Sequence, residues 1–279
     1  MNSRWLREAL FGSSLARVCS TWLALMVLAA LAGPALSPWD PQAINWDALD
    51  NPPSSSHWLG TDMIGRDLLT RIMLGARISL SVALIATAVS VVIGIPYGTL
   101  AGYLGGRADQ LMMRIVDTLY ALPFILIVIL LVVVFGRSQL LLFAALGAVF
   151  WLDIARIVRG QTLRIRESDY IAAARIQGAG PTRILIRHLI PNVLGPAVVY
   201  ATLTVPGVIL AESFISFLGL GVQEPDTSWG VLIADGAQNM ESAPWALVFP
   251  ALALAATVWS LNMLGDRLRD QLDVQAARV

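Results

Sequence analysis

Long apolar stretches alternate with short charged segments along this chain. A helix needs about 20 apolar residues to cross the core of a bilayer, and six stretches of roughly that length are uncharged, except that the fourth contains Asp153 near its end. They are residues 18–39, 78–106, 118–136, 138–155, 188–211 and 242–265. The fourth is the shortest, so it is expected to be a short or tilted span. The pattern predicts an all-α polytopic membrane protein with about six transmembrane helices.

The first apolar stretch has a second interpretation, as a secretory signal peptide. Arg4 and Arg7 precede an apolar core that begins near Trp22, which is the order of charge and apolarity in such peptides. The uncharged stretch is long, however, and no clear A-x-A cleavage site precedes Asp40. These features favour a retained helix, with residues 1–38 forming the N-terminal tail and the first span.

The arginines are distributed unequally when six spans are threaded from a cytoplasmic N-terminus. Fifteen fall on the inner side: Arg4, Arg7, Arg17, Arg107, Arg114, Arg156, Arg159, Arg164, Arg166, Arg175, Arg183, Arg187, Arg267, Arg269 and Arg278. Four fall on the outer side: Arg66, Arg71, Arg77 and Arg137. Cytoplasmic loops carry such an excess of positive residues. The distribution therefore predicts that both termini are cytoplasmic.

The composition excludes several kinds of chemistry. Hydrophobic residues make up 57% of the chain, charged residues 14%, and the net charge is zero, so nothing indicates nucleic-acid binding. All 19 basic residues are Arg, and the lack of Lys excludes a Walker A phosphate loop and a Schiff-base lysine. With one cysteine, Cys19, and two distant histidines, His57 and His188, no metal site and no bound cofactor are predicted.

An amphipathic pattern begins near the end of the first external segment, residues 39–75. Apolar residues recur at helical spacing over 68–78, beside two arginines. This spacing predicts a helix that lies at the outer membrane interface, as a structural cap on the bundle. Trp229 and Trp245, near the other long external loop, are predicted interfacial anchors.

The cytoplasmic segment 156–187 has more order than a plain positive loop. It holds seven arginines and two acids. Ser168 and Asp169 are candidate N-caps, the alanines at 172–174 favour a helix, and Gly178 is suited to end it. A second apolar helical pattern follows and leads into the fifth span. Two short helices meeting at glycine predict a compact protrusion suited to docking.

Several motifs follow the pattern of one family. Residues 173–178 (AARIQG), with 187–192 (RHLIPN) downstream, resemble the cytoplasmic EAA motif of ABC importer permeases. Further matching segments are 59–62 (LGTD), 65–67 (GRD), 151–162 (WLDIARIVRGQT), 216–221 (SFLGLG), 223–225 (QEP) and 265–270 (GDRLRD). Nearly the whole chain beyond Pro38 is similar to the C-type permeases of oligopeptide and dipeptide uptake systems, and among these to the oligopeptide permease C subunits.

The resemblance implies the type I ABC importer permease fold. Residues 76–266 would form a five-helix transmembrane domain with a coupling loop at about 163–191, and 267–279 a cytoplasmic tail. It implies a non-enzymatic permease subunit that forms half of a pathway for peptides across a bacterial cytoplasmic (inner) membrane. The implied partners are a homologous B-type permease, one or two cytoplasmic ATPase subunits that bind ATP and Mg, and an external peptide-binding protein.

The same resemblance assigns ATPase coupling to the cytoplasmic loop. The residues concerned are Asp169, Ala172, Ala173, Ala174, Arg175, Gly178, Ala179, Arg187 and Pro191. The family motif begins with Glu, whereas this chain has Ala172 there. Asp169 is the nearest preceding acid, and an acid near a helix start interacts favourably with the helix dipole. Our hypothesis is that Asp169 partly replaces the missing Glu; an Asp169→Ala protein with full ATPase coupling would exclude it.

Glycines in the second span form a regular repeat. Gly94, Gly98 and Gly102 recur at every fourth position, which predicts a face suited to close helix packing. A gating hinge, helped by Pro96, is the alternative interpretation.

Ionisable residues and prolines in the spans are candidate functional positions. Glu212 and Pro206, in or beside the fifth span, are candidates for lining the pathway. Asp117 and Asp153 are expected near the cytoplasmic ends of their spans, each with an arginine three residues away, so structural ion pairs are predicted for both.

Two other functions fit a polytopic chain without nucleotide motifs. A proton-coupled secondary transporter would show inverted repeats and carboxylates near the membrane midplane, but no such repeat is evident and the acids cluster at the predicted span ends. A membrane-bound enzyme would need a catalytic cluster such as G-x-S-x-G, which the sequence lacks.

Overall fold

The computed structural model describes residues 9–136 and 138–276, and most of these are helical. The helices are α2 (Ser14–Leu36), η1 (Trp46–Ala48), α3 (Leu68–Leu104), α4 (Gly106–Tyr120), α5 (Phe124–Phe135), α6 (Gln139–Arg166), α7 (Asp169–Ile176), α8 (Pro181–Ile184), η2 (Leu185–Leu189), α9 (Ile190–Phe217), α10 (Trp229–Gln238) and α11 (Pro244–Ala276). Four arginines of the charge count, Arg4, Arg7, Arg137 and Arg278, lie outside the described residues.

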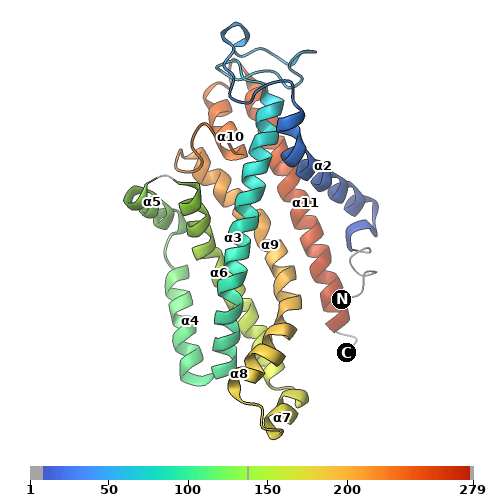
Figure 1. The fold of residues 1–279 in the computed structure, drawn as a ribbon, viewed down its shortest axis with the longest axis vertical. Helices are drawn as coiled ribbons and strands as arrows, with labels where there is room; N and C mark the ends of the chain where they lie inside the picture. The colour runs from blue at the N-terminus through green and yellow to red at the C-terminus, as the bar shows by residue number, and fades with distance from the viewer. Residues whose placement is uncertain (1–8, 137, 277–279) are drawn as a thin grey trace.

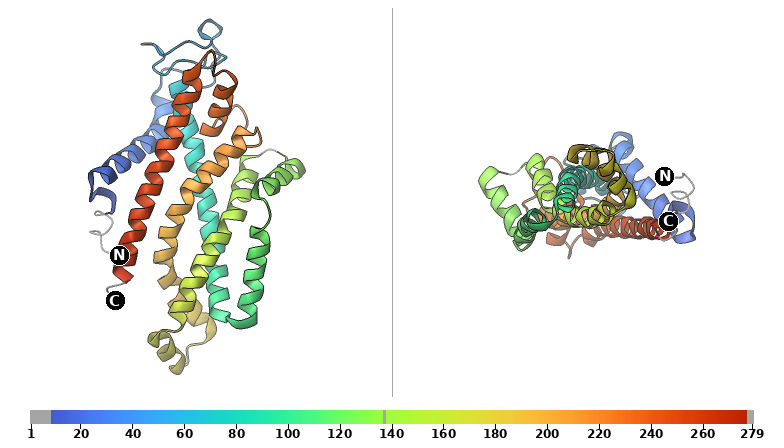
Figure 2. Two further views of the ribbon diagram at one scale, coloured as in Figure 1. Left: turned by 180° about the vertical axis from the view of Figure 1, so that it is seen from behind. Right: turned by 90° about the horizontal axis from the view of Figure 1, so that it is seen from below.

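Within the described part of the chain, five helical segments are long and apolar enough to cross a membrane, or six if the bent pair of α4 and α5 counts as one crossing. The five are Ser14–Leu36, Leu68–Leu104, Leu141–Arg166, Pro181–Phe217 and Pro244–Gln271. Figure 1 shows an elongated bundle with α3 running through its middle. Figure 2 shows α4 and α5 on one side of that bundle and α2 with α11 on the other.

The third predicted span, 118–136, is not a straight helix. α4 ends at Tyr120, α5 begins at Phe124, and their axes differ by 78°. Pro123 has no N–H to donate and disfavours a helical conformation in the residue before it, so the helix breaks there. α5 has 12 residues; at 1.5 Å per residue it is about 18 Å long, too short to cross a bilayer alone.

The fourth predicted span extends beyond Ala155 as a continuous helix to Arg166. Ser138 caps its start, because the hydroxyl accepts a hydrogen bond from the backbone N–H of Leu141 at 3.3 Å. Arginine is a good helix former, so the charges that end the apolar stretch do not end the helix. The predicted end at 155 is therefore too early, and Asp153 lies at the middle of α6 and not near its end.

The predicted interfacial helix at 68–78 is wrong, because α3 runs without a break from Leu68 to Leu104. Leu68 is buried, and Gly75 lies against Trp229 at the start of α10. Trp229 itself is fully buried, so it is not the predicted interfacial anchor. The apolar face at the start of α3 thus packs on protein, and an amphipathic pattern alone does not distinguish protein from lipid headgroups.

The three glycines of α3 lie against α6. A Cβ atom built on Gly94 would be 2.7 Å from Cβ of Ile154, and one built on Gly98 would collide with the carbonyl oxygen of Ala155. A Cβ atom built on Gly102 would be 2.7 Å from Cβ of Thr162, further along α6. The repeat therefore allows the two helix backbones to approach closely, which is the packing role expected from its spacing.

Candidate functional site

A helical protrusion ends the bundle at the base of Figure 1, where α7 and α8 lie between α6 and α9. α7 stops where Gly178 takes a left-handed conformation, with φ of 82°. The backbone N–H of Ala179 bonds back to the carbonyl of Ala174 at 3.0 Å, as in a glycine-terminated helix. α8 begins at Pro181. The prediction of two short helices separated by glycine is confirmed.

The start of α7 differs in detail from the prediction. Ser168 occupies the N-cap position, but its hydroxyl donates to the carbonyl of Ile165 at 2.6 Å and makes no capping bond to α7. Asp169 is the first residue of the helix and is exposed. Its carboxylate is therefore close to the positive end of the helix dipole.

One face of α7 holds the protrusion to the bundle. Ile171 is fully buried and forms a small apolar cluster with Ile184 of α8 and Leu189 of η2, against the side chains of Tyr103 and Ile165. These contacts join α7 to both α3 and the helices that follow it. Leu189 in turn lies directly before α9, so the same cluster connects α7 to the start of that helix.

The opposite face of α7 is open. Ile176 is 89% exposed, the most exposed of the large hydrophobic side chains in the described chain. The predicted coupling residues that are exposed are Asp169, Ala172, Ala173, Arg175, Gly178, Arg187 and Pro191, and Ala174 and Ala179 are half-buried. Ala172, where the family motif has Glu, is on the open surface, so no buried charge is missing there.

A π-helical turn, η2, connects α8 to α9, and the sequence analysis missed it. The backbone N–H of Ile190 bonds to the carbonyl of Leu185, five residues earlier. Pro191 follows and has no N–H for the carbonyl of Arg187, four residues before it, so an ordinary α ladder is interrupted at this point. Pro191 was the one feature of the sequence that could have indicated this π-helical turn. The segment from Pro181 to Phe217 is consequently one span with a widened turn at its base.

Charged side chains, three of them buried, gather at the other end of the bundle, between the external loop and α10. Arg66 donates to Asp62 at 2.7 Å and to Glu224 at 2.8 Å. Arg71 is 1% exposed and lies 3.5 Å from Asp62 and 3.9 Å from both Glu224 and Asp235. We call these five residues the outer clamp, because they tie together the external loop, the start of α3, the segment after α9, and α10.

The outer clamp shifts the proton affinity of two of its acids. The hydrogen bond from Arg66 holds the pKa of Glu224 below its usual range, since it stabilises the charged carboxylate. Burial raises the pKa of Asp235, and the nearby charge of Arg71 offsets only part of that effect.

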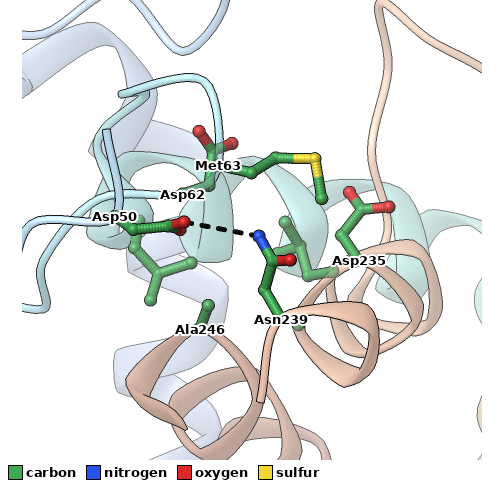
Figure 3. A pocket seen from close by; sticks show the side chains of 9 residues that line it. Asp50, Asp62, Met63, Asp235, Asn239 and Ala246 are labelled. Atoms are coloured by element: carbon green, nitrogen blue, oxygen red, sulfur yellow. Dashed lines mark hydrogen bonds between the residues drawn. The ribbon is translucent and has the colours of Figure 1, made fainter. Parts of the chain in front are cut away.

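A small pocket adjoins the outer clamp (Figure 3). Asp50 from the external loop faces Asn239 at the end of α10, whose amide donates to it at 3.4 Å, and Asp62, Met63 and Asp235 surround the same space. Among the described residues, no group of three or more His, Cys, Asp or Glu side chains is arranged to hold a metal ion. The acids of this pocket thus serve as hydrogen-bond and ion-pair partners.

The two pathway candidates lie inside the chain. Glu212 is 0% exposed and accepts hydrogen bonds from Ser79 at 3.1 Å and Ser216 at 2.7 Å. Pro206 is also buried. Both side chains are enclosed within this subunit, and the serine hydroxyls satisfy Glu212 and join α9 to α3. A role for either residue in lining the pathway stays a prediction.

The predicted pairs of Asp117 and Asp153 are also different in the structure. Arg156 binds Asp117 at 2.9 Å, joining α6 to α4, and Arg159 binds Asp109 on the same helix with two hydrogen bonds. Asp153 makes no ion pair among the described residues. Because α6 extends to Arg166, Asp153 lies at the midpoint of the helix and not near its end.

A bundle of membrane-crossing helices with an exposed short helix at one end has the architecture of a membrane transporter subunit. The comparison with known families agrees. The chain belongs to the family of binding-protein-dependent transport system inner membrane components, which matches residues 94–276. Residues 3–53 match the N-terminal transmembrane domain of oligopeptide transport permease C. The protein is thus a multi-pass inner-membrane permease subunit of an ABC importer.

Individual relatives are similar over most of their length. The oligopeptide transport system permease protein OppC of Escherichia coli K12 is 51% identical over 253 residues, covering 90% of this chain and 84% of the relative. OppC of Haemophilus influenzae is 47% identical, covering 90% and 81%. The dipeptide transport system permease protein DppC of Bacillus subtilis is 46% identical over 257 residues, covering 92% and 80%.

Proposed function

We propose that this chain forms half of a translocation pathway for short peptides and receives the driving force at α7. The names of its relatives, which include oligopeptide and dipeptide permeases, support a peptide substrate. The complete transporter would contain a homologous B-type permease, one or two cytoplasmic ATPase subunits that bind ATP and Mg, and an external peptide-binding protein. This chain supplies membrane passage, and the ATPases supply energy.

The exposed face of α7 is the observation that carries the coupling role. Ile176 is almost fully exposed while Ile171, on the same short helix, is fully buried. Covering an isoleucine side chain stabilises a complex by about 1.5–3 kcal/mol, so a groove on a partner would bind this face. Arg175 beside it adds a charge that orients the contact.

The path of force follows the packing. A partner that moves α7 also moves Ile171, which contacts Ile184 and Leu189. Those two residues lie in the helical segment that continues as α9. Nucleotide-driven closure of the ATPases would therefore tilt or bend α9, shifting the subunit between two states that bind the ATPases differently.

The test is reconstitution of the four kinds of subunit in proteoliposomes. We expect peptide uptake that needs ATP and the loaded binding protein, and we expect Ile176→Asp to uncouple hydrolysis from uptake by placing a charge in an apolar contact. Ile44→Asp is the matched control, since Ile44 is 50% exposed in the external loop. Normal peptide-stimulated ATPase activity in Ile176→Asp would contradict the coupling role.

The alternative function, proton-coupled secondary transport, predicts a different result in the same assay. Uptake by this chain without ATPase subunits, abolished by a protonophore, would contradict the proposal. ATP-dependent uptake that survives the protonophore supports it.

A further inference from the structure

Asp153 places a carboxylate at the centre of a membrane-spanning helix. It is at the midpoint of the 28-residue helix α6. The next residue, Ile154, packs on Gly94, near the centre of the uncharged stretch 78–106 of α3. Both positions thus lie near the middle of helices that are long and apolar enough to cross a membrane. An ionisable side chain there is costly unless it is paired or faces a pathway.

Arg156 acts on this carboxylate through its charge but forms no ion pair or hydrogen bond with it. Arg156, one turn along α6, is directed to Asp117 at 2.9 Å and stacks over the ring of Tyr120 at 4.9 Å. Neither an ion pair nor a hydrogen bond reaches Asp153 among the described residues. Glu212 is the contrasting case, because serine hydroxyls satisfy it in the interior.

Asp153 instead lines a cavity of about 320 Å³ on the side of the bundle formed by α4, α5 and α6. This volume is at the lower end of the range for ligand pockets, about 300–1,000 Å³. Three aromatic rings contribute to the walls: Tyr120, Phe124 and Phe150. The rings of Phe124 and Phe150 are 6.1 Å apart and nearly perpendicular, at 71°.

The broken span forms the facing wall of the same cavity. Leu122 lies in the non-helical segment between α4 and α5, and both it and Tyr120 are exposed at the surface of the chain. Irregular backbone at membrane depth occurs where it is buried in protein or lines a water-filled cavity. Substrate sites of transporters lie at such helix breaks near the midplane. The cavity therefore has the expected surroundings of a site on a pathway between two subunits.

We propose that Asp153 and the rings of Phe124 and Phe150 form a cation subsite, which receives an ammonium group of the peptide as it crosses. This rests on the proposed transport of peptides. The carboxylate supplies the opposite charge, because Arg156 acts on it without forming an ion pair and is bonded to Asp117 instead. The aromatic faces attract the ammonium through cation–π interactions. The site is shallow and open, so the contact lowers the barrier to passage without trapping the peptide.

The test uses the complete transporter in proteoliposomes and three peptides of equal length. N-acetyl-Ala-Nle-Ala has no ammonium group, Ala-Nle-Ala has one at its N-terminus, and N-acetyl-Ala-Lys-Ala has one on its side chain. Uptake is measured with binding protein whose loading by each peptide has been determined separately. Comparison of the two charged peptides shows which ammonium group the site receives.

We expect Asp153→Asn to slow at least one ammonium-bearing peptide about tenfold, which corresponds to about 1.4 kcal/mol, while the uncharged peptide changes less than about twofold. Asp153→Glu should restore the preference, because it keeps the charge. Glu241→Gln, in an exposed external turn, is the control for removing an acid. Equal slowing of all three peptides, or no slowing of any, would overturn the subsite.

A second measurement covers the case in which Asp153→Asn does not assemble. In the wild-type complex trapped with vanadate, a hydrophobic carbodiimide should label Asp153, and an ammonium-bearing peptide should protect it while the acetylated neutral peptide does not. Equal labelling with every peptide would reject the proposal. Failure of the wild-type complex to import any peptide is a different result, which would contradict the proposed function itself.

Discussion

Gly94→Ala tests whether glycine sets the approach of α3 to α6. The new Cβ would lie 2.7 Å from Cβ and Cγ2 of Ile154 and 2.9 Å from the carbonyl oxygen of Trp151. Carbon atoms in contact are ordinarily about 3.5–4.0 Å apart, so the helices would have to separate locally by about 0.8 Å. Ile154 cannot yield easily, because its Cβ is fixed to the backbone and the residue is 1% exposed.

The expected net effect combines two opposing contributions. Overpacking of this kind costs about 1–3 kcal/mol, and replacing glycine by alanine inside a helix gains about 0.5–1 kcal/mol. We expect a loss of about 0.5–2 kcal/mol in the free energy of unfolding, measured by thermal unfolding in detergent with tryptophan fluorescence as the signal.

Gly160→Ala provides the matched control for this measurement. Gly160 is within α6, and no atom lies within 4 Å of the position its Cβ would occupy. Its replacement should leave the unfolding temperature unchanged or raise it, through helix propensity alone. If Gly94→Ala proved as stable as Gly160→Ala, the packing argument would be refuted. Lost transport at unchanged stability would favour the alternative of a gating hinge.

Three further predictions concern the protrusion, the outer clamp and the buried acid. Ile171→Ala should destabilise the fold of residues 169–184 by about 2–4 kcal/mol, seen as faster amide hydrogen exchange there. Arg66 lowers the pKa of Glu224, so the stabilisation from this pair should be complete above about pH 4.3 and lost as pH falls through the lowered pKa. Proteolysis of the external loop at pH 3–6 measures this loss. Glu224→Gln should show a smaller change in proteolysis rate over the same pH range. Glu212→Ala should lower the unfolding free energy by about 1–3 kcal/mol, more than Glu212→Gln.

The existence and order of the spans could be predicted from the sequence with little error. A bilayer offers no water to backbone polar groups, so a long apolar stretch has almost no alternative to a helix. The protrusion could be predicted for a similar reason, since alanines favour a helix and Gly178 allows the left-handed end. The motifs from residues 59 to 270 were also sufficient to indicate the family.

The errors occurred where two elements had to be placed against each other. The segment 68–78 has an amphipathic pattern that fits a membrane interface as well as it fits the side chain of Trp229, and only the fold places that side chain there. Arg156 is three residues from Asp153 in the sequence, but in the structure it forms its ion pair with Asp117 of α4.

Hydropathy and propensity thus determined that this chain crosses a membrane, where it does so, and that it exposes a short helix at one end of the bundle. Hydropathy and helix propensity describe the average interaction of a segment, one helical turn or longer, with its surroundings. Only the tertiary structure decided that Arg66 and Glu224, 158 residues apart, form a pair, that Glu212 is enclosed by serines, and that Asp153 lines a cavity while Arg156 pairs with Asp117. These contacts depend on the distances between helices, which the sequence of a single segment does not determine.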